Sequence, residues 1–496
     1  MSSFKTPGVY IVEKNAFPNS VVEVATAVPA FIGYTEYAKN GNKSLLDKPW
    51  KINSLGEFEQ YFGKGPKPFF EISETTEASR TWYESTLRCN GKDYKIKRQD
   101  SYNFYYAIRF FFANGGGSCY IVSVDEGYSG ELEKAKLING IQTLVKEQEP
   151  TILVVPEAVY LEDDQSCFDI QTAMLQHCGH TMRNRFAVLD VYGGYKSPND
   201  PSGNVITNFR DKIGTEFLDF GASYYPWVNT SVVPTSEVDF TNISNLDELI
   251  KVLRDEAQGK DHLLEVIDKI NSPDDELTPD VIHKILSKHS LAYQEIMKEM
   301  LYTLNMMPPG AAMAGIYTLV DSTKEVWKAP ANIGLSNVVS PMVNISHADQ
   351  EDLNVPLNGK SVNAIRYFVG EGVKVWGART LDGNSLDWRY INVRRTMIML
   401  EESIKNATKA FVFEPNTANT WVSVRSMISN FLNGVWKRGG LAGSSPEDAY
   451  SVHIGLGETM TPEDILEGIM NITVLVAVVR PAEFIVITFQ QQMQKS

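Results

Sequence analysis

The segment Asn471-Ile-Thr-Val-Leu-Val-Ala-Val-Val-Arg-Pro-Ala-Glu-Phe-Ile-Val-Ile-Thr-Phe489 contains two runs of apolar, mostly β-branched residues. Arg480, Pro481 and Glu483 separate a run of eight residues (472–479) from a run of six (484–489). A membrane-spanning helix needs about 20 consecutive apolar residues, so neither run is long enough. Their length and β-branched content instead predict two strands joined by a short kink.

Neither run alternates polar with apolar residues, so we expect each strand to be covered on both faces. Pro481 cannot donate a ladder hydrogen bond and marks a break or an edge between them. The second strand needs a sheet to join. Exposed strand edges recruit strands from other chains, so that sheet need not belong to the same subunit.

Composition limits the possible partners of this 496-residue chain. The net charge of −15 and the pI of about 5.1 argue against a general nucleic-acid binder. Charge is uneven, with 15 acidic and 7 basic residues over 237–299 but 8 basic and 4 acidic over 387–438. The start lacks the pattern of a signal peptide, and four cysteines are too few for a disulfide framework. We therefore expect synthesis in a reducing cytoplasm.

From residue 105 to 227 the chain alternates between apolar runs and helix-compatible segments. This alternation predicts an α/β layer with mostly parallel strands. A pair of strands is predicted before it (21–25 and 30–34), and an acidic helical insertion after it (239–304). The runs are 119–124, 151–155, 186–191 and 222–227, and the helices between them 130–146, 164–180 and 211–220.

The C-terminal part has the clearest helical pattern. Apolar residues step by three and four from Tyr390 to Phe411 and again from Trp421 to Val435, which predicts two amphipathic helices. Thr461-Pro-Glu-Asp464 predicts the start of a short third helix, with threonine as the N-cap. Gly468 would end it and lead into the first apolar run.

No set of residues predicts catalysis or a cofactor. Asn114-Gly-Gly-Gly-Ser118 precedes a strand rather than a helix, so a turn is favoured over a phosphate site. Cys167, His177, Cys178 and His180 match no zinc spacing. Asp190 ends a strand, where it either forms a turn or serves an enzyme site. A basic set belongs either to solvated helix faces or to a surface for an acidic partner; it comprises Arg389, Arg394, Arg395, Arg425, Lys437 and Arg438.

Blocks spread along nearly the whole chain resemble the contractile tail sheath family of phage tails and related injection systems. The acidic segment 239–304 is the part without a clear counterpart. The blocks are Thr6-Pro-Gly-Val-Tyr10, Thr26-Ala-Val-Pro-Ala-Phe-Ile-Gly33, Ser54 with Phe58 and Phe62-Gly63, Arg109-Phe-Phe-Phe-Ala-Asn-Gly-Gly116, Cys119-Tyr-Ile-Val122, Ala314-Gly-Ile-Tyr317, Val326-Trp-Lys-Ala-Pro-Ala-Asn332, Asn363-Ala-Ile-Arg366, Val375-Trp-Gly-Ala-Arg-Thr380, Trp388-Arg-Tyr-Ile-Asn-Val-Arg-Arg395 and Pro481-Ala-Glu-Phe-Ile485.

The resemblance implies that arms at both ends of the chain add strands to neighbouring subunits' sheets. These arms would be Val9, Tyr10, Ile11 and Val12 at one end, and Phe484, Ile485, Val486, Ile487 and Phe489 at the other. It also implies a C-terminal helix facing an inner tube, with Trp421, Arg425, Lys437 and Arg438 as contacts. The expected segments are an N-terminal arm with the first strands (1–30), a peripheral mixed region (31–104), an α/β domain (105–235), an acidic helical insertion (236–305), a return to the α/β domain (306–360) and a C-terminal sheath domain (361–496).

The sequence as a whole thus predicts a structural subunit without enzymatic activity or cofactor. By resemblance, it would polymerise as stacked hexameric rings around an inner tube and contract from a metastable extended state. Its partners would be its own copies, the tube protein, and baseplate and terminal cap proteins, with no nucleic acid and no membrane insertion. The particle would be a phage tail or a tail-like particle released from the cell. The alternatives are a non-contractile ring or cap protein and an α/β enzyme with its site near Asp190.

Overall fold

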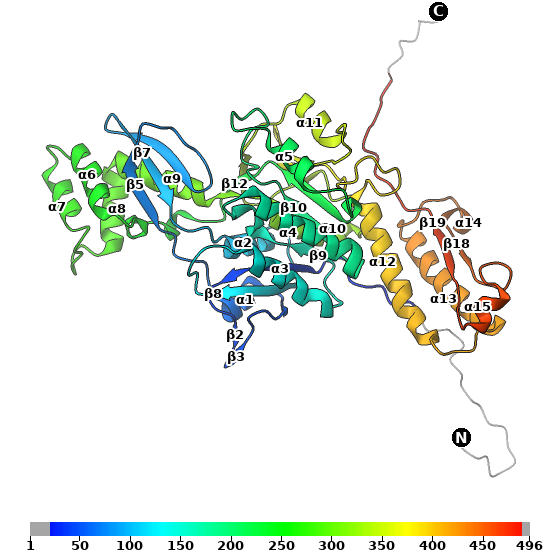
Figure 1. Cartoon of the computed structure of the whole chain (residues 1–496). Helices are drawn as coiled ribbons and strands as arrows, with labels where there is room; N and C mark the ends of the chain where they lie inside the picture. The colour runs from blue at the N-terminus through cyan, green and yellow to red at the C-terminus, as the bar shows by residue number, and fades with distance from the viewer. Residues whose placement is uncertain (1–19, 489–496) are drawn as a thin grey trace, which may run out of the picture. The chain divides into compact units, whose positions relative to one another are not determined.

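The computed structural model describes residues 20–488, which fold into two compact units (Figure 1). We call residues 25–395 the main unit, and residues 20–24 together with 396–488 the C-terminal unit. Helices and strands occur in both, so the predicted mixed α/β class is confirmed. The division is coarser than the six predicted segments, whose boundaries remain predictions.

A nine-stranded sheet forms the centre of the main unit. Six neighbouring strands, from β16 to β8, run parallel, and antiparallel strands flank them at both edges. The strand order is β14 (Ile333–Gly334), β17 (Gly372–Trp376), β16 (Asn363–Phe368), β11 (Gly221–Tyr225), β10 (Phe186–Asp190), β9 (Ile152–Val154), β1 (Pro29–Thr35), β8 (Cys119–Glu126) and β4 (Trp50–Ile52).

The apolar runs in the sequence are the parallel strands of this sheet. All seven residues of β1 are buried, as are all residues of β9, β10 and β11. Strands covered on both faces lose the alternation of polar and apolar residues, which explains why these runs are continuous. The prediction of mostly parallel strands in this region is confirmed.

Helices cover both faces of the sheet (Figure 1). On one face, Phe31 of β1 packs on Phe111 of α2 (Phe104–Ala113), with ring centroids 4.9 Å apart. On the other face, Ile32 meets Gly140 of α3 (Lys134–Thr143), where an added Cβ would lie 2.6 Å from the isoleucine methyl group. Successive strand residues point to opposite faces, so one strand anchors both helix layers. The layers also contain α1 (Leu55–Phe62), α4 (Asp164–Gln176), α5 (Val205–Lys212), α10 (Gly310–Lys324) and α11 (His347–Asn354).

Two predicted elements are wrong. The helix expected over 211–220 instead spans Val205–Lys212, because the Asn204 side chain accepts N–H bonds from Ile206 and Thr207 and caps its start. Gly214, at φ +78°, follows its end, since only glycine adopts that conformation at little cost. No strand forms over 21–25.

The predicted acidic insertion is helical, as expected. It contains α6 (Leu246–Glu256), α7 (Asp261–Asp268), α8 (Pro279–His289) and α9 (Leu291–Leu304). These helices pack with a three-stranded antiparallel sheet, β5 (Phe70–Glu74), β7 (Lys92–Arg98) and β6 (Glu84–Cys89). Smaller pairings complete the main unit: β12 (Val228–Thr230) with β13 (Met306–Met307) and β15 (Val338–Pro341), and the hairpin β2 (Lys39–Asn40) to β3 (Lys43–Ser44).

The C-terminal unit follows the predicted pattern of two long helices, a short one and a sheet. α12 (Ile391–Thr408) enters it from the main unit, and α13 (Ala418–Lys437) buries Val424, Ile428 and Val435 of the predicted stripe. α14 (Pro446–Ala449) leads to β18 (Tyr450–His453), and β19 (Thr473–Val476) returns antiparallel to it. Between them, α15 (Pro462–Leu466) has a capping box of Thr461 and Asp464, as the sequence predicted.

Candidate assembly site

The sheet of the C-terminal unit consists of β18 and β19. Tyr450 pairs with Val476 and His453 with Thr473, and within residues 20–488 no third named strand joins them. A single isolated two-stranded sheet is marginally stable in water, and three or more strands are usually needed. Leu475 of β19 is 57% exposed. The predicted cover on both faces is therefore wrong for the single chain, because no second layer packs on this strand.

The second apolar run leaves this sheet as coil rather than as a strand. Its side chains Phe484, Ile485, Val486 and Ile487 are between 71% and 89% exposed. Such contiguous exposed apolar residues are typical of a protein–protein contact. Val9, Tyr10, Ile11, Val12 and Phe489, the other predicted arm residues, lie outside the described part of the chain.

Exposed apolar side chains concentrate in the C-terminal unit. It holds 98 of the 469 described residues but 12 of the 23 large apolar side chains that these residues expose. Phe413, in the loop between α12 and α13, is fully exposed and has a φ of +70°, which is uncommon for a bulky residue. This unit is thus the part of the chain with most unmet apolar surface.

The beginning of the described chain is attached to the same unit. The backbone N–H of Val24 donates to Ser403 Oγ at 3.1 Å, and the carboxylate of Glu23 forms an ion pair with Arg438. Residue 20 and the exposed segment 484–487 therefore both leave from the C-terminal unit.

The four residues expected to contact a tube lie along or just after α13. Trp421 donates its indole N–H to Asn416 Oδ1 at 2.6 Å and is half-buried. Arg425 contacts Glu458 Oε2 at 3.0 Å and Ile454 O at 2.5 Å. Arg438 pairs with Glu23, whereas the side chain of Lys437 is exposed. The structure thus places these residues on one helix but does not bring them into one patch of available cations.

A polar cluster that the sequence analysis missed surrounds β18. His453 Nδ1 lies 2.6 Å from Glu458 Oε1, and its Nε2 lies 3.1 Å from Ser451 Oγ. Glu458 also binds Arg425, so the cluster links β18 to α13. Ser451 and His453 share a strand face at a spacing of two, which is a pattern too short to stand out in the sequence.

Two arginines of the basic set are buried, so neither of the readings considered for that set is correct for them. Arg395 forms a two-point ion pair with Asp321 at 3.0 and 2.6 Å, and its guanidinium lies 4.7 Å from the centre of the Tyr317 ring. Arg394 lies between the rings of Phe220 and Trp388, 3.6 Å from Asp219. Both hold α12 in the main unit.

Asp190 neither forms a turn nor faces an active site. Its side chain is buried, and Oδ1 accepts the backbone N–H of Gly310 at 2.7 Å, at the first residue of α10. Burial raises the pKa of its carboxyl to about 7, and the Gly310 hydrogen bond opposes that rise. Asp190 is thus a helix-capping group.

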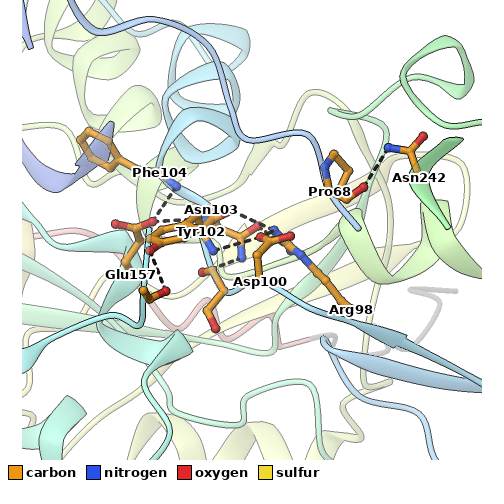
Figure 2. Close-up of polar contacts among 10 residues, drawn as sticks. Pro68, Arg98, Asp100, Tyr102, Asn103, Phe104, Glu157 and Asn242 are labelled. Atoms are coloured by element: carbon orange, nitrogen blue, oxygen red, sulfur yellow. Dashed lines mark hydrogen bonds and ion pairs between the residues drawn. The ribbon is translucent and has the colours of Figure 1, made fainter. Parts of the chain in front are cut away.

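A second buried carboxylate, Glu157, fastens three segments of the main unit (Figure 2). It accepts backbone N–H bonds from Tyr34 at 2.9 Å, Asn103 at 3.0 Å and Phe104 at 3.2 Å. Beside it, Arg98 binds Asn103 Oδ1 at 3.1 Å, as well as Asp100 and the carbonyl of Tyr102 (Figure 2). The network has no solvent-facing carboxylate at its centre, since Glu157 is fully buried.

The remaining sequence candidates have structural roles. Asn114 to Ser118 is a turn into β8, as predicted, and Ser336 N–H donates to Asn114 Oδ1 at 2.8 Å. His177 Nε2 lies 2.7 Å from the guanidinium of Arg185, and burial lowers the pKa of that histidine to about 4. In the part of the chain that is described, no three histidine, cysteine or acidic residues are grouped to hold a metal, and no helix is long and apolar enough to cross a bilayer.

Comparison with known proteins assigns this arrangement to a family. The phage tail sheath C-terminal domain family matches residues 384–492, which include nearly all of the C-terminal unit. The sheath of the extracellular contractile injection system PVC, in its contracted state, is 28% identical with a TM-score of 0.61, over 99% of both chains. Along its whole length the chain is similar to contractile tail sheath proteins, and its C-terminal part matches their C-terminal domain family.

Two further relatives fit this assignment. The contracted helical sheath of the anti-feeding prophage (AFP) is 27% identical to this sheath protein, with a TM-score of 0.60, over 99% of this chain and all of the other. The tail sheath protein of Enterobacteria phage T4 is 25% identical over 135 residues, 27% of this chain. That match spans a fifth of the phage protein's length.

These comparisons settle two points about the sheath protein. The proteins it matches are structural sheath proteins rather than enzymes. The PVC match spans 99% of the chain and so extends over the acidic segment 239–304, for which the sequence blocks offered no counterpart.

Proposed function

We propose that this sheath protein polymerises as a helical stack of hexameric rings around an inner tube. It would assemble in a metastable extended state and contract to drive the tube through a target envelope. The observation that carries the proposal is the exposed apolar segment 484–487, which leaves a unit whose own sheet has only two named strands.

Within the described residues, the exposed segment has no sheet to pair with, and the β18–β19 sheet has a free edge that could accept a strand. A strand without a sheet and a sheet without a third strand are both satisfied when the segment of one subunit pairs with the sheet of the next. Burying its four large apolar side chains contributes about 6–12 kcal/mol before ordering costs. Fixing the backbone of four residues opposes this by about 4–8 kcal/mol. One arm therefore stabilises the polymer modestly, and the lattice depends on many of them.

The N-terminal arm supplies the second link. Residues 20–24 are bound to the C-terminal unit, and Val9, Tyr10, Ile11 and Val12 precede them in the sequence by a short spacer. An arm at each end lets each subunit hold two neighbours. Arms of this kind would act as hinges during contraction, because they keep subunits connected while other contacts change.

We assign the inner-tube contact to α13. Trp421, Arg425, Lys437 and Arg438 lie on it or at its end, and its solvent face also carries Val422, which is 62% exposed. Lys437 is the residue whose charge is most available, and Arg425 and Arg438 would contribute by exchanging Glu458 and Glu23 for acidic groups of the tube.

The further partners are baseplate and terminal cap proteins of a phage tail or an extracellular injection particle. Contraction would draw on energy stored at assembly, so the proposal invokes no nucleotide and no catalytic step. A non-contractile ring or cap protein of the same particle is the second candidate, and it would form rings without long tubes.

The test compares the full chain with a variant that lacks residues 482–496. Because the described part of that segment, residues 482–488, has no buried residue, the truncated protein should remain folded by circular dichroism and soluble. It should fail to form the tubes that the full chain forms in negative-stain electron microscopy, with the tube protein added where a template is needed.

The matched control replaces four exposed apolar residues of the main unit, Val355, Leu357, Val369 and Leu386, by serine. This control should polymerise like the full chain. Normal tubes from the truncated protein would refute strand exchange through this arm.

A further inference from the structure

A wide groove lies at the carboxyl ends of the parallel strands in the main unit. Residues 159–164, which follow β9, and residues 192–196, which follow β10, line it, together with Trp82 and Tyr83. Its volume is about 1180 Å³. Pockets for drug-sized molecules have about 300–1,000 Å³. In open α/β sheets, ligands bind at this edge.

The unpaired charge of the groove is negative. Of its four cations, Arg98 is paired with Asp100 at 2.6 Å and Lys134 with Asp169 at 2.6 Å, whereas Lys97 and Lys196 have no ion-pair partner among the described residues. Six carboxylates line the groove against these four cations. Three lining carboxylates make no side-chain hydrogen bond or ion pair with any residue of the described range; they are Glu131, Glu162 and Asp211.

Aromatic side chains accompany these carboxylates. Trp82, Tyr192 and Tyr195 line the groove and are each partly exposed. Carboxylates beside aromatic rings attract ammonium groups, through ion pairing and through the negative face of the ring. The groove therefore suits a lysine-bearing segment.

The main unit itself carries such a segment. The hairpin of β2 and β3 exposes six consecutive residues, Lys39 to Ser44, with the sequence Lys-Asn-Gly-Asn-Lys-Ser (Figure 1). Buried Ala38 and Leu45 anchor its base, and Leu45 N–H donates to Ala38 O at 2.8 Å. Lys43 makes no side-chain hydrogen bond or ion pair within residues 20–488, and the ammonium of Lys39 lies over the ring of Tyr37. Because its base is anchored and its tip is exposed and basic, the hairpin is suited to insert into an acidic groove.

We propose that the Lys39–Ser44 hairpin of one subunit docks in this groove of a second copy. The contact joins two different surfaces of the same chain, so it repeats from subunit to subunit as a helical or ring assembly requires. It rests on the proposed sheath function, which it deepens by naming a contact between main units that is separate from the strand arms.

The test uses disulfide trapping between two full-chain variants that keep these charges, Asn42→Cys in the hairpin and Thr207→Cys in the groove lining, mixed in equal amounts under oxidising conditions. The four native cysteines are buried and give little background. The control mixes Asn42→Cys with Asp275→Cys, an exposed position in the acidic insertion. We expect the first mixture to give at least tenfold more mixed dimer than the control.

Charge reversal then tests the chemistry. Lys39→Glu in the hairpin partner, or Asp211→Lys in the groove partner, should each lower trapping about tenfold, and the two together should restore it. Trapping equal to the control, or no restoration in the double reversal, overturns the docking.

Electron microscopy of the wild-type chain keeps this outcome separate from the sheath proposal. Tubes without trapping refute only the docking. Trapping without tubes, in the presence of the tube protein, refutes the sheath proposal and leaves the docking in place.

Discussion

Buried charged groups in the main unit link segments of the chain through hydrogen bonds. Asp190 ends the parallel strand β10, and Glu157 follows the parallel strand β9. Both accept a backbone N–H bond at the start of a helix, from Gly310 of α10 and from Phe104 of α2 respectively. A helix N-terminus carries a partial positive charge, which favours a carboxylate at that position. Burial opposes this and raises the pKa of each carboxyl to about 7.

The raised pKa of Asp190 predicts that the protein loses stability as pH rises. The folded-state pKa lies above the ordinary value of 3.8, so the folded state holds the proton more tightly. This stabilisation is complete below about pH 4 and is lost as pH rises through 7, an effect of about 4 kcal/mol. Asp190→Asn should remove it and reduce the slope of the urea midpoint against pH between 5 and 8, leaving the part that Glu157 contributes through its own pKa of about 7. The exposed control Asp211→Asn should keep the wild-type slope, and an unchanged slope in Asp190→Asn would contradict the assignment.

The buried pair of Arg395 and Asp321 predicts a large effect of removing one partner. Their side chains are 3% and 5% exposed, and Arg395→Met would leave a carboxylate without its counter-ion. We expect a loss of about 3–5 kcal/mol in the free energy of unfolding, with much of it recovered in Arg395→Met/Asp321→Leu. The surface pair of Lys212 and Asp164 is the control, and Lys212→Met should cost less than about 1 kcal/mol in the same denaturant titration.

At the scale of elements, the C-terminal sheet of the single chain is incomplete, because it has two named strands within the described range and only one covered face. α13 packs against β18 and gives the sheet one supported face, but β19 keeps Thr473 and Leu475 exposed. The loop from β18 to β19 adds the exposed side chains of Leu456 and Leu466. Neighbouring subunits are the natural cover for these groups, because the assembly would bury them without changing the fold of the chain.

This view predicts that Leu475→Lys separates folding from assembly. The leucine is exposed in the subunit, so the free energy of unfolding should change by less than about 0.5 kcal/mol. Polymer formation, measured as the fraction that sediments, should fall several-fold because the lysine would be buried between copies. Leu357→Lys, at a fully exposed leucine of the main unit, should leave sedimentation unchanged. An equal loss in both variants would point to a nonspecific effect of charge.

The elements that the sequence predicted best are those whose buried face is visible as a pattern in their own residues. Continuous apolar runs became the buried parallel strands, and steps of three and four became α12 and α13. The helix expected over 211–220 was misplaced because Phe217, Leu218 and Phe220 suggested a helical stripe, whereas the Asn204 cap starts the helix earlier. β18 has four residues and no distinct pattern, so the first tail run could not be assigned its partner.

At the scale of the whole molecule, the interaction surfaces are brought together by topology. The groove is lined by residues between positions 82 and 211, which meet because parallel strands end at one edge of the sheet. These residues are far apart in the sequence, so no local pattern predicts the groove. The two tail runs could be predicted as strands because their length and β-branched content are visible in the sequence alone. The β18–β19 sheet, which we propose as the acceptor of the tail, could be found only in the structure. The same is true of the caps formed by Asp190 and Glu157 and of the burial of Arg394 and Arg395.

Strand exchange between subunits is the central claim, and a helical reconstruction by cryo-electron microscopy tests it most directly. The specimen is the polymer of the full chain formed on its tube protein. We predict that residues 484–487 appear as a strand paired with the β18–β19 sheet of a neighbouring subunit, with Phe484 and Ile485 buried. A tail folded back on its own subunit, or a two-stranded sheet with no added strand in the assembled polymer, would contradict the account.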